Sequence, residues 1–248
     1  KPSDQILKTN YNNKEVYFLP RHGKGHFISP SNINFRANID AMKQLGVTDI
    51  ISVSAVGSLK EEHAPGKFVL VDQFIDWTKG LRKRTFFEKG VVGHVSCAVP
   101  VNLDLRDRIG KVLETTNIEY SIGGSYLCIE GPQFSTQAES GIYRSFKADV
   151  IGMTNVPESF LAKEAGMAYA TVAMVTDYDC WKDEHCTLEE IMKVMGNNYQ
   201  SAQTIISKLI PSLHEKPIVF EAENKFAVVT NPDLISSKNK EIMATLIN

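Results

Sequence analysis

The sequence predicts an α/β protein with a single domain over residues 1–248. Segments rich in β-branched and aromatic residues alternate with segments of helical periodicity, which is the pattern of strands alternating with helices. No repeat, low-complexity tract or linker divides the chain. Hydrophobic residues make up 43% and charged residues 23%, as in ordinary globular proteins, and the length is sufficient for a large buried core.

The first half of the chain contains three predicted strands and two predicted helices. The strands cover 14–20, 48–54 and 67–75, and the helices cover 31–46 and 102–117. In the first helix Phe35, Ile39 and Met42 recur on one face, Ser31 or Asn32 can cap the start, and Gly46 ends it.

The second half continues the alternation. Strands are predicted at 125–131 and 168–175, and helices at 138–146, 158–166, 187–209 and 237–247. The longest helix opens with TLEE, in which Thr187 and Glu190 have the spacing of a capping box.

Composition excludes several classes of function. The formal net charge is −2, so we expect no nucleic-acid partner. No apolar run approaches the roughly 20 residues that span a bilayer, and no signal segment opens the chain, so we expect no membrane association. The four cysteines form no CxxC pair and fit reduced thiols, which predicts a cytoplasmic protein.

Other residues are expected to carry no chemistry. His185 and Cys186 lie near Cys180, but no further ligands follow at suitable spacing, so no metal site is predicted. No GxSxG elbow is present. We expect His63 to lie in a solvated loop, and the basic run 79–89 to form a solvated face.

Polar residues gather where predicted strands end. These segments are RHGKGH (21–26), SAVGS (54–58), EGPQF (130–134) with GMT (152–154) downstream, and TDYDCW (176–181). Ligands of α/β proteins bind at the ends of strands, so together these segments predict one shared pocket.

Two of these segments, together with Thr154, have the chemistry of a phosphate site. Arg21 can bind an oxyanion in bidentate fashion, and His22 can add a donor. Ser54 offers a hydroxyl followed by backbone amides, and Thr154 offers a second hydroxyl. This set suits inorganic phosphate. The alternative is an ordinary turn with a surface arginine and a structural serine.

TDYDCW suggests recognition of a flat heterocycle. Asp177 and Asp179 are two residues apart and would point the same way on an extended strand. One carboxylate can accept a hydrogen bond from an exocyclic amine, and a buried one can protonate a ring nitrogen. Adenine offers both groups through N6 and N7. The alternative is that the two aspartates cap the following turn.

FLPRHGKGHFISPSNINFRANIDAMKQLG, SAVGSL, FIDWT, IEGPQFSTQAES, GMTNVPE, LAKEAG and TDYDCW occur in this order. The chain resembles the trimeric purine nucleoside phosphorylase family, and TDYDCW narrows the resemblance to its 5′-methylthioadenosine phosphorylases. The resemblance covers most of residues 1–210. It implies a mixed central sheet, partly barrel-like and flanked by helices, assembled as a homotrimer.

The resemblance also implies a reaction and its reactants. The reaction is phosphorolysis of 5′-methylthioadenosine to adenine and 5-methylthioribose 1-phosphate, in purine and methionine salvage. Phosphate is a co-substrate, and no metal or organic cofactor is implied. The residues that would hold phosphate are Arg21, His22, Ser54, the amide of Ala55, and Thr154.

For the nucleoside, the resemblance assigns roles residue by residue. Asp177 would be the general acid at N7, and Asp179 would help to hold N6. Phe134 would pack on base and ribose, and Met153 would contact the ribose hydroxyls. His94 would reach the 5′-substituent of a neighbouring subunit. The residues that would line the methylthio pocket are Leu188, Ile191 and Met192, for which simple helix core is the alternative.

Two departures from the family pattern are visible. Ser54 stands where these enzymes usually carry threonine, which preserves the hydroxyl. The family's glycine-rich N-terminal phosphate loop would precede Lys1 and is expected to be missing from this chain. Three other functions remain open: a nucleosidase that uses water, a phosphorylase of adenosine, 6-oxopurine nucleosides or 5′-methylthioinosine, and a non-catalytic nucleoside-binding protein.

Overall fold

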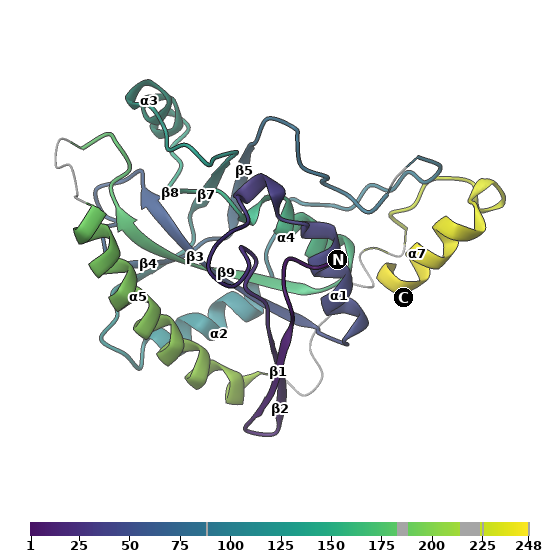
Figure 1. Ribbon diagram of the computed structural model, residues 1–248, viewed down its shortest axis with the longest axis horizontal. Helices are drawn as coiled ribbons and strands as arrows, with labels where there is room; N and C mark the ends of the chain where they lie inside the picture. Colours follow the sequence, from purple (N-terminus) through teal and green to yellow (C-terminus); the bar gives the residue numbers. More distant parts are fainter. Residues whose placement is uncertain (88, 183–187, 214–223, 225, 248) are drawn as a thin grey trace.

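The computed structural model describes residues 1–87, 89–182, 188–213, 224 and 226–247, without the side chains of residues 188, 191 and 245–247. Its strands are β1 (Leu7–Tyr11), β2 (Lys14–Phe18), β3 (Asp49–Ser58), β4 (Phe68–Leu70), β5 (Gln73–Trp77), β6 (Tyr120–Ile122), β7 (Ser125–Ile129), β8 (Val150–Gly152) and β9 (Ala168–Asp177). Its α-helices are α1 (Phe35–Gln44), α2 (Leu103–Leu113), α3 (Gln137–Ser145), α4 (Asn155–Glu164), α5 (Leu188–Leu209) and α7 (Ser237–Ile247). Most of the helices lie around a mixed sheet, and α7 lies apart from it (Figure 1).

The central sheet has seven strands in the order β5-β7-β8-β3-β9-β4-β6. β4 and β5 are consecutive in the chain, yet they lie near opposite ends of this order. Because only Val71 and Asp72 separate them, the two ends of the sheet must approach each other, and the sheet curls. The predicted α/β fold with a partly barrel-like mixed sheet is confirmed.

The long parallel pair β3 and β9 forms the middle of the sheet. Asp49 to Gly57 pair with Ala168 to Asp177, with a shift in register between Val56 and Gly57. β9 is buried along its whole length except for Asp177. A strand made of small and β-branched residues can be covered on both faces, which explains the absence of polar alternation in AYATVAMV.

Helices cover the sheet in two groups (Figure 1). Helices α2 and α5 pack against β9 and β4 through a buried cluster that includes Leu105, Ile109 and Ile205. Helices α1 and α4 pack together in a second cluster that includes Ile39 and Leu161. Each cluster removes a continuous apolar surface from water, which is the main favourable contribution to folding.

Several predicted boundaries are wrong. Residues 30–32 form a short 3₁₀ turn, and the side chain of Asn34 caps α1 instead of Ser31 or Asn32. The predicted strand 67–75 is two strands, because β4 pairs with β6 and β9 while β5 pairs with β7. The β1–β2 hairpin was not predicted, although Asn12 and Asn13 form its turn with positive φ angles. Thr187 lies outside the described residues.

Two residues that were expected to be solvated are buried. His63 is 5% exposed, and its Nε2 lies 3.1 Å from Oδ1 of Asp149, which also accepts from Lys60. Arg82 in the basic run 79–89 is also 5% exposed. The expectation for His63 is wrong, and the expectation for the run 79–89 is wrong at Arg82, because each of these side chains has acceptors from distant parts of the chain. The other basic residues of the run, Lys79, Lys83, Arg84 and Lys89, are exposed as expected. No helix in the described part of the chain combines the length and apolar character needed to cross a membrane.

Candidate active site

Arg21 is the centre of a hydrogen-bonded group of polar side chains. It follows β2, and its Nη1 donates to Oγ1 of Thr154 at 2.9 Å. Nη2 donates to Oγ of Ser52 at 2.7 Å. A buried carboxylate, Glu158, forms an ion pair with Nη1 at 3.3 Å and accepts a hydrogen bond from the Tyr169 hydroxyl at 2.8 Å. The guanidinium plane is therefore held in one orientation by partners from β3, from the end of β8 and from α4, and Glu158 is itself held by Tyr169 of β9.

The two predicted phosphate hydroxyls lie beside each other. Oγ of Ser54 on β3 is 3.5 Å from Oγ1 of Thr154, which follows β8. The hydroxyl of Tyr126 lies 3.3 Å from Ser54 and accepts from the backbone amide of Thr154 at 3.5 Å. Burial raises the pKa of Tyr126 to about 12, so its hydroxyl stays neutral and keeps its proton. Arg21, Ser54 and Thr154 together offer one fixed cation and two hydroxyls to an oxyanion.

One ring nitrogen of His22 is occupied by a hydrogen bond to the backbone. Its Nδ1 lies 2.8 Å from the carbonyl oxygen of Ile28, and its ring stacks on that of His26 at 4.2 Å. A nitrogen facing a carbonyl acts as the donor, so only protonated His22 has a second N–H for a ligand. Burial lowers the pKa of His22. The residue lies in the expected loop, but its donor capacity depends on pH.

Asp177 is the last residue of β9. It pairs with Gly57 on β3, and a Cβ added at Gly57 would lie 3.5 Å from Oδ2 of Asp177. Oδ1 accepts from the Thr176 hydroxyl at 2.6 Å, and Oδ2 accepts from the backbone amide of Asp179 at 2.9 Å. Glycine at position 57 thus leaves room beside the carboxylate, between the two central strands.

The two aspartates do not continue one extended strand, so this prediction is wrong. The strand ends at Asp177, and Asp179 has a φ of +52°, in the left-handed region. Burial raises the pKa of Asp179, and the charge of the adjacent Asp177 acts in the same direction. The turn therefore places the two aspartates in different surroundings, with the backbone amide of Asp179 bound to the carboxylate of Asp177.

The predicted nucleoside residues Phe134 and Met153 differ in exposure, since Met153 is partly buried. Phe134, in the loop between β7 and α3, is 84% exposed. Met153 packs on Gly131, where an added Cβ would lie 2.4 Å from the methionine sulfur. Trp181 donates from Nε1 to the carbonyl of Ser58 at 2.7 Å and lies under the guanidinium of Arg144. These contacts place the loops after β7, β8 and β9 around the same edge of the sheet.

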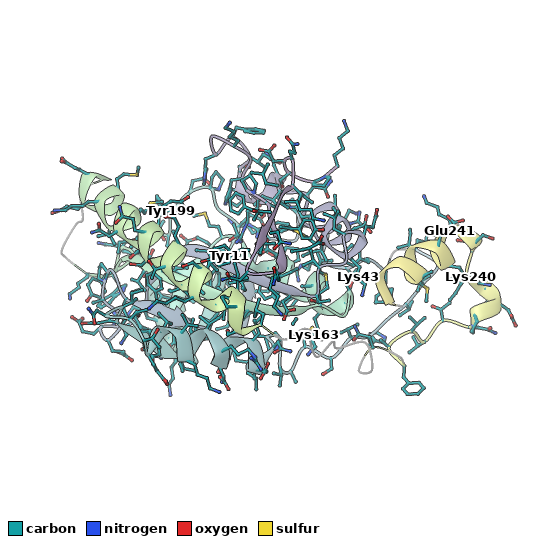
Figure 2. The ribbon with its side chains drawn as sticks, turned by 90° about the horizontal axis from the view of Figure 1, so that it is seen from below. Tyr11, Lys43, Lys163, Tyr199, Lys240 and Glu241 are labelled. Carbon is teal, nitrogen blue, oxygen red and sulfur yellow. The ribbon has the colours of Figure 1, made fainter. Side chains whose placement is uncertain are left out.

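The structure does not bring every predicted residue together. Met192 on α5 is exposed, and the side chains of Leu188 and Ile191 lie outside the described residues. His94 is exposed, and its amide donates to Ala227 in the segment that leads to α7. Figure 2 shows α7, with Lys240 and Glu241, at the opposite end of the molecule from Tyr199 on α5. The contribution of His94 to another subunit's site stays a prediction.

Sequence reasoning missed the residues that hold Arg21 and Ser54 in place, directly or through one intervening side chain. They are Ser52, Tyr126, Glu158 and Tyr169. The sequence contains one signal, since Glu158 is a carboxylate that comes shortly after GMT, in the first turns of the next helix. The described residues contain no group of three potential metal ligands, and His185 and Cys186 lie outside that part of the chain.

Comparison with known proteins agrees with this geometry. The family model of the phosphorylase superfamily matches residues 2–211. The S-methyl-5′-thioadenosine phosphorylase of Rhodospirillum rubrum is 49% identical over 239 residues, which cover 93% of this chain and 80% of the relative. A crystal structure of a methylthioadenosine phosphorylase from an antarctic soil metagenomic library is 42% identical, with a TM-score of 0.94 over 100% of this chain and 88% of that one.

A more distant structure has a ligand. The methylthioadenosine phosphorylase of Schistosoma mansoni in complex with adenine is 31% identical, with a TM-score of 0.83 over 99% of this chain and 88% of that one. The fold, the strand-end site and the family match together lead to one assignment. The chain belongs to the phosphorylase superfamily.

Proposed function

We propose that the protein cleaves 5′-methylthioadenosine by phosphorolysis, releasing adenine and 5-methylthioribose 1-phosphate. The observation that carries this proposal is the pairing of β3 with β9, which sets Asp177 opposite Gly57, three residues after Ser54, whose hydroxyl lies 3.5 Å from that of Thr154. A cationic oxyanion site and a carboxylate pair at one sheet edge can hold phosphate and a purine on opposite sides of a sugar. Relatives with the same fold and 42–49% identity bear the name of this activity.

Phosphate occupies the Arg21 side in this proposal. The guanidinium and the hydroxyls of Ser54 and Thr154 would bind its oxygens, with the amide of Ala55 and protonated His22 as further donors. Glu158 and Tyr169 hold the guanidinium before phosphate arrives, so little reorganisation is needed. The bound oxygen attacks C1′ of the ribose, and a new C1′–O bond forms. Two reactants held in this way react as an effectively unimolecular pair.

The purine occupies the aspartate side. As the C1′–N9 bond breaks, its electron pair moves onto the base, and a proton delivered to N7 neutralises the charge. Asp177 would deliver this proton, and Asp179 would accept a hydrogen bond from N6. An ionised carboxylate accepts from a 6-amino group and repels a 6-oxo group, so we expect aminopurines to be preferred.

The remaining assignments belong to the same proposal. Phe134 and Met153 would contact base and ribose, while Leu188, Ile191 and Met192 would line the methylthio pocket. A homotrimer would bring His94 to the open side of a neighbouring site. We also propose a cytoplasmic enzyme of purine and methionine salvage that needs no metal or organic cofactor. The free thiols of Cys97, Cys128 and Cys180 in the described part of the chain support a reducing compartment.

The test is release of adenine from 5′-methylthioadenosine with and without inorganic phosphate. Inosine, adenosine and 5′-methylthioinosine are the comparison substrates. Release that requires phosphate and favours the 6-amino base is the expected result. Release in water alone would mean a nucleosidase, and a preference for 6-oxo substrates would contradict the role given to the aspartates. Tight binding without turnover would mean a nucleoside-binding protein.

A further inference from the structure

Arg82 is a buried arginine with all three guanidinium nitrogens hydrogen-bonded. Nη1 donates to the carbonyl of Val156 at 2.6 Å, and Nη2 donates to the carbonyl of Glu130 at 2.9 Å. Nη2 also lies 3.3 Å from the carbonyl of Ile129. The guanidinium lies 5.5 Å from the ring centroid of Phe35. A planar fork with this many acceptors is specific to arginine, because lysine offers one nitrogen.

The carbonyls that Arg82 binds belong to two separate loops of the site. Ile129 and Glu130 end β7 and begin the loop to Phe134. Val156 lies two residues after Thr154, at the start of α4. Arg82 therefore joins the loop after β7 to the loop after β8, between which Met153 packs on Gly131.

The carboxylate of Glu130 completes this group. It accepts from Nε of Arg82 at 3.2 Å, from the hydroxyl of Ser31, and from the backbone amide of Lys79 at 2.7 Å. Ser31 begins the approach to α1, after the loop that contains Arg21. The charge of Arg82 is thus paired inside the protein, where an unpaired charge would be strongly unfavourable.

We propose that Arg82 is a positioning residue for nucleoside binding, which holds the loops of Phe134 and Met153 at a fixed separation. The inference rests on the proposed function for its substrate, 5′-methylthioadenosine. Arg82 acts through Phe134 and Met153, and the cleft between these two side chains depends on the distance between their loops.

The described hydrogen bonds of Arg82 do not reach Arg21, Ser54 or Thr154. Thr154 is held separately by Arg21 at 2.9 Å and by the Tyr126 hydroxyl at 3.5 Å. Ser54 lies on the central strand β3, which Arg82 does not contact in the hydrogen bonds described. Loss of the Arg82 fork should therefore weaken nucleoside binding more than phosphate binding. A fold defect would instead lower the amount of active enzyme and leave both KM values unchanged.

The test is Arg82→Lys, with Arg84→Lys as the matched control. Arg84 lies in the same segment, but its guanidinium is half-exposed and pairs with Asp76 at 2.8 Å. For Arg82→Lys we expect the KM for 5′-methylthioadenosine to rise about tenfold or more, since small misplacements of binding groups have large effects. The KM for phosphate should stay within about twofold, as for independent sites. Arg84→Lys should change neither.

A milder variant covers the case in which Arg82→Lys does not fold. Glu130→Gln keeps the shape of the acceptor and removes its charge, so we expect about a threefold rise in the nucleoside KM alone. Equal changes in both KM values, or a fall in kcat with both KM values unchanged, would overturn the proposal.

Hydrogen–deuterium exchange gives a readout that needs no turnover. In Arg82→Lys or Glu130→Gln, we expect the amides of residues 129–131, 133, 134, 155 and 156 to exchange at least about threefold faster than in the wild type, while those of β3 and β9 keep their rates. Unchanged exchange in the two loops would overturn the positioning role. If the wild-type protein lacks phosphorolysis and the variants still show this exchange pattern, the proposed function is contradicted. The coupling of the two loops through Arg82 then still stands.

Discussion

Ser54 and Thr154 on the phosphate side of the site are each 6% exposed, whereas Phe134 on the nucleoside side is 84% exposed. The first side is built from the central strands and from a helix packed on them, and its polar groups are already hydrogen-bonded to one another. The second side is built from loops and from the exposed start of α5.

This difference separates two kinds of binding. A small, invariant ion such as phosphate suits a rigid set of buried donors. A larger substrate needs surfaces that can close around it, and loops with few buried contacts are the parts of a fold that move most easily. The open side is also where another subunit or the substrate itself can complete the site.

The largest effect is expected for Asp177→Asn. An amide cannot deliver a carboxyl proton to N7, so kcat for 5′-methylthioadenosine should fall about 10³-fold. Activity on 5′-methylthioinosine or inosine should increase, because asparagine can donate to a 6-oxo group. Steady-state kinetics on both substrates measure the change, and the dissociation constant for phosphate from calorimetry is the control. Unchanged adenine release would remove Asp177 from its role.

The next effect is expected for Arg21→Lys, on the buried side. An ammonium cannot contact Thr154, Ser52 and Glu158 at once, so the charge loses its fixed orientation. We expect kcat/KM for phosphate to fall about 10²-fold. The dissociation constant for adenine should stay nearly constant. If adenine binding weakens as much as phosphate binding, the buried side and the open side of the site are coupled and do not bind their ligands independently.

A smaller effect is expected for Phe134→Ala, on the open side. Loss of a stacking ring should raise the KM for the nucleoside about tenfold. Because Phe134 is almost fully exposed, the melting temperature should change little. Phe18→Ala on the β1–β2 hairpin removes another exposed ring and is the matched control. A nucleoside KM equal to the wild-type value would place the base elsewhere.

The smallest effect on activity is expected for Asp149→Asn, outside the site. Burial alone would raise the pKa of Asp149, but hydrogen bonds from His63 and Lys60 hold it well below its ordinary value of 3.8. The ionised form thus stabilises the fold above about pH 4, and this stability is lost as the pH falls further. We expect the variant to lose about 2 kcal/mol of unfolding free energy at pH 7.

Denaturant titrations at several pH values test this expectation. Between pH 4 and about pH 2, the stability of Asp149→Asn should fall less steeply than that of the wild type, because the variant has one fewer carboxylate to protonate. Both KM values at pH 7 should equal those of the wild type. Parallel curves for the two proteins would show that the Asp149 group does not contribute to acid sensitivity.

The sequence predicts the parts of this molecule that depend on local pattern. The buried strand before Asp177, most helices and the polar strand ends all follow from periodicity and composition. The burial of His63 and Arg82 does not, because their acceptors lie far away in the chain. The left-handed conformation of Asp179 also escaped prediction, since aspartate adopts it only in particular turns.

Ser54 and Asp177 come from distant parts of the chain, and the pairing of β3 with β9 brings them to one region of the sheet. A chain emerging from the ribosome can therefore build the Arg21 loop and β3 long before it has a site. Long-range strand pairing is slow compared with local helix formation. Affinity for phosphate and adenine should thus arise in the last stages of folding, and both ligands should draw late intermediates toward the native state.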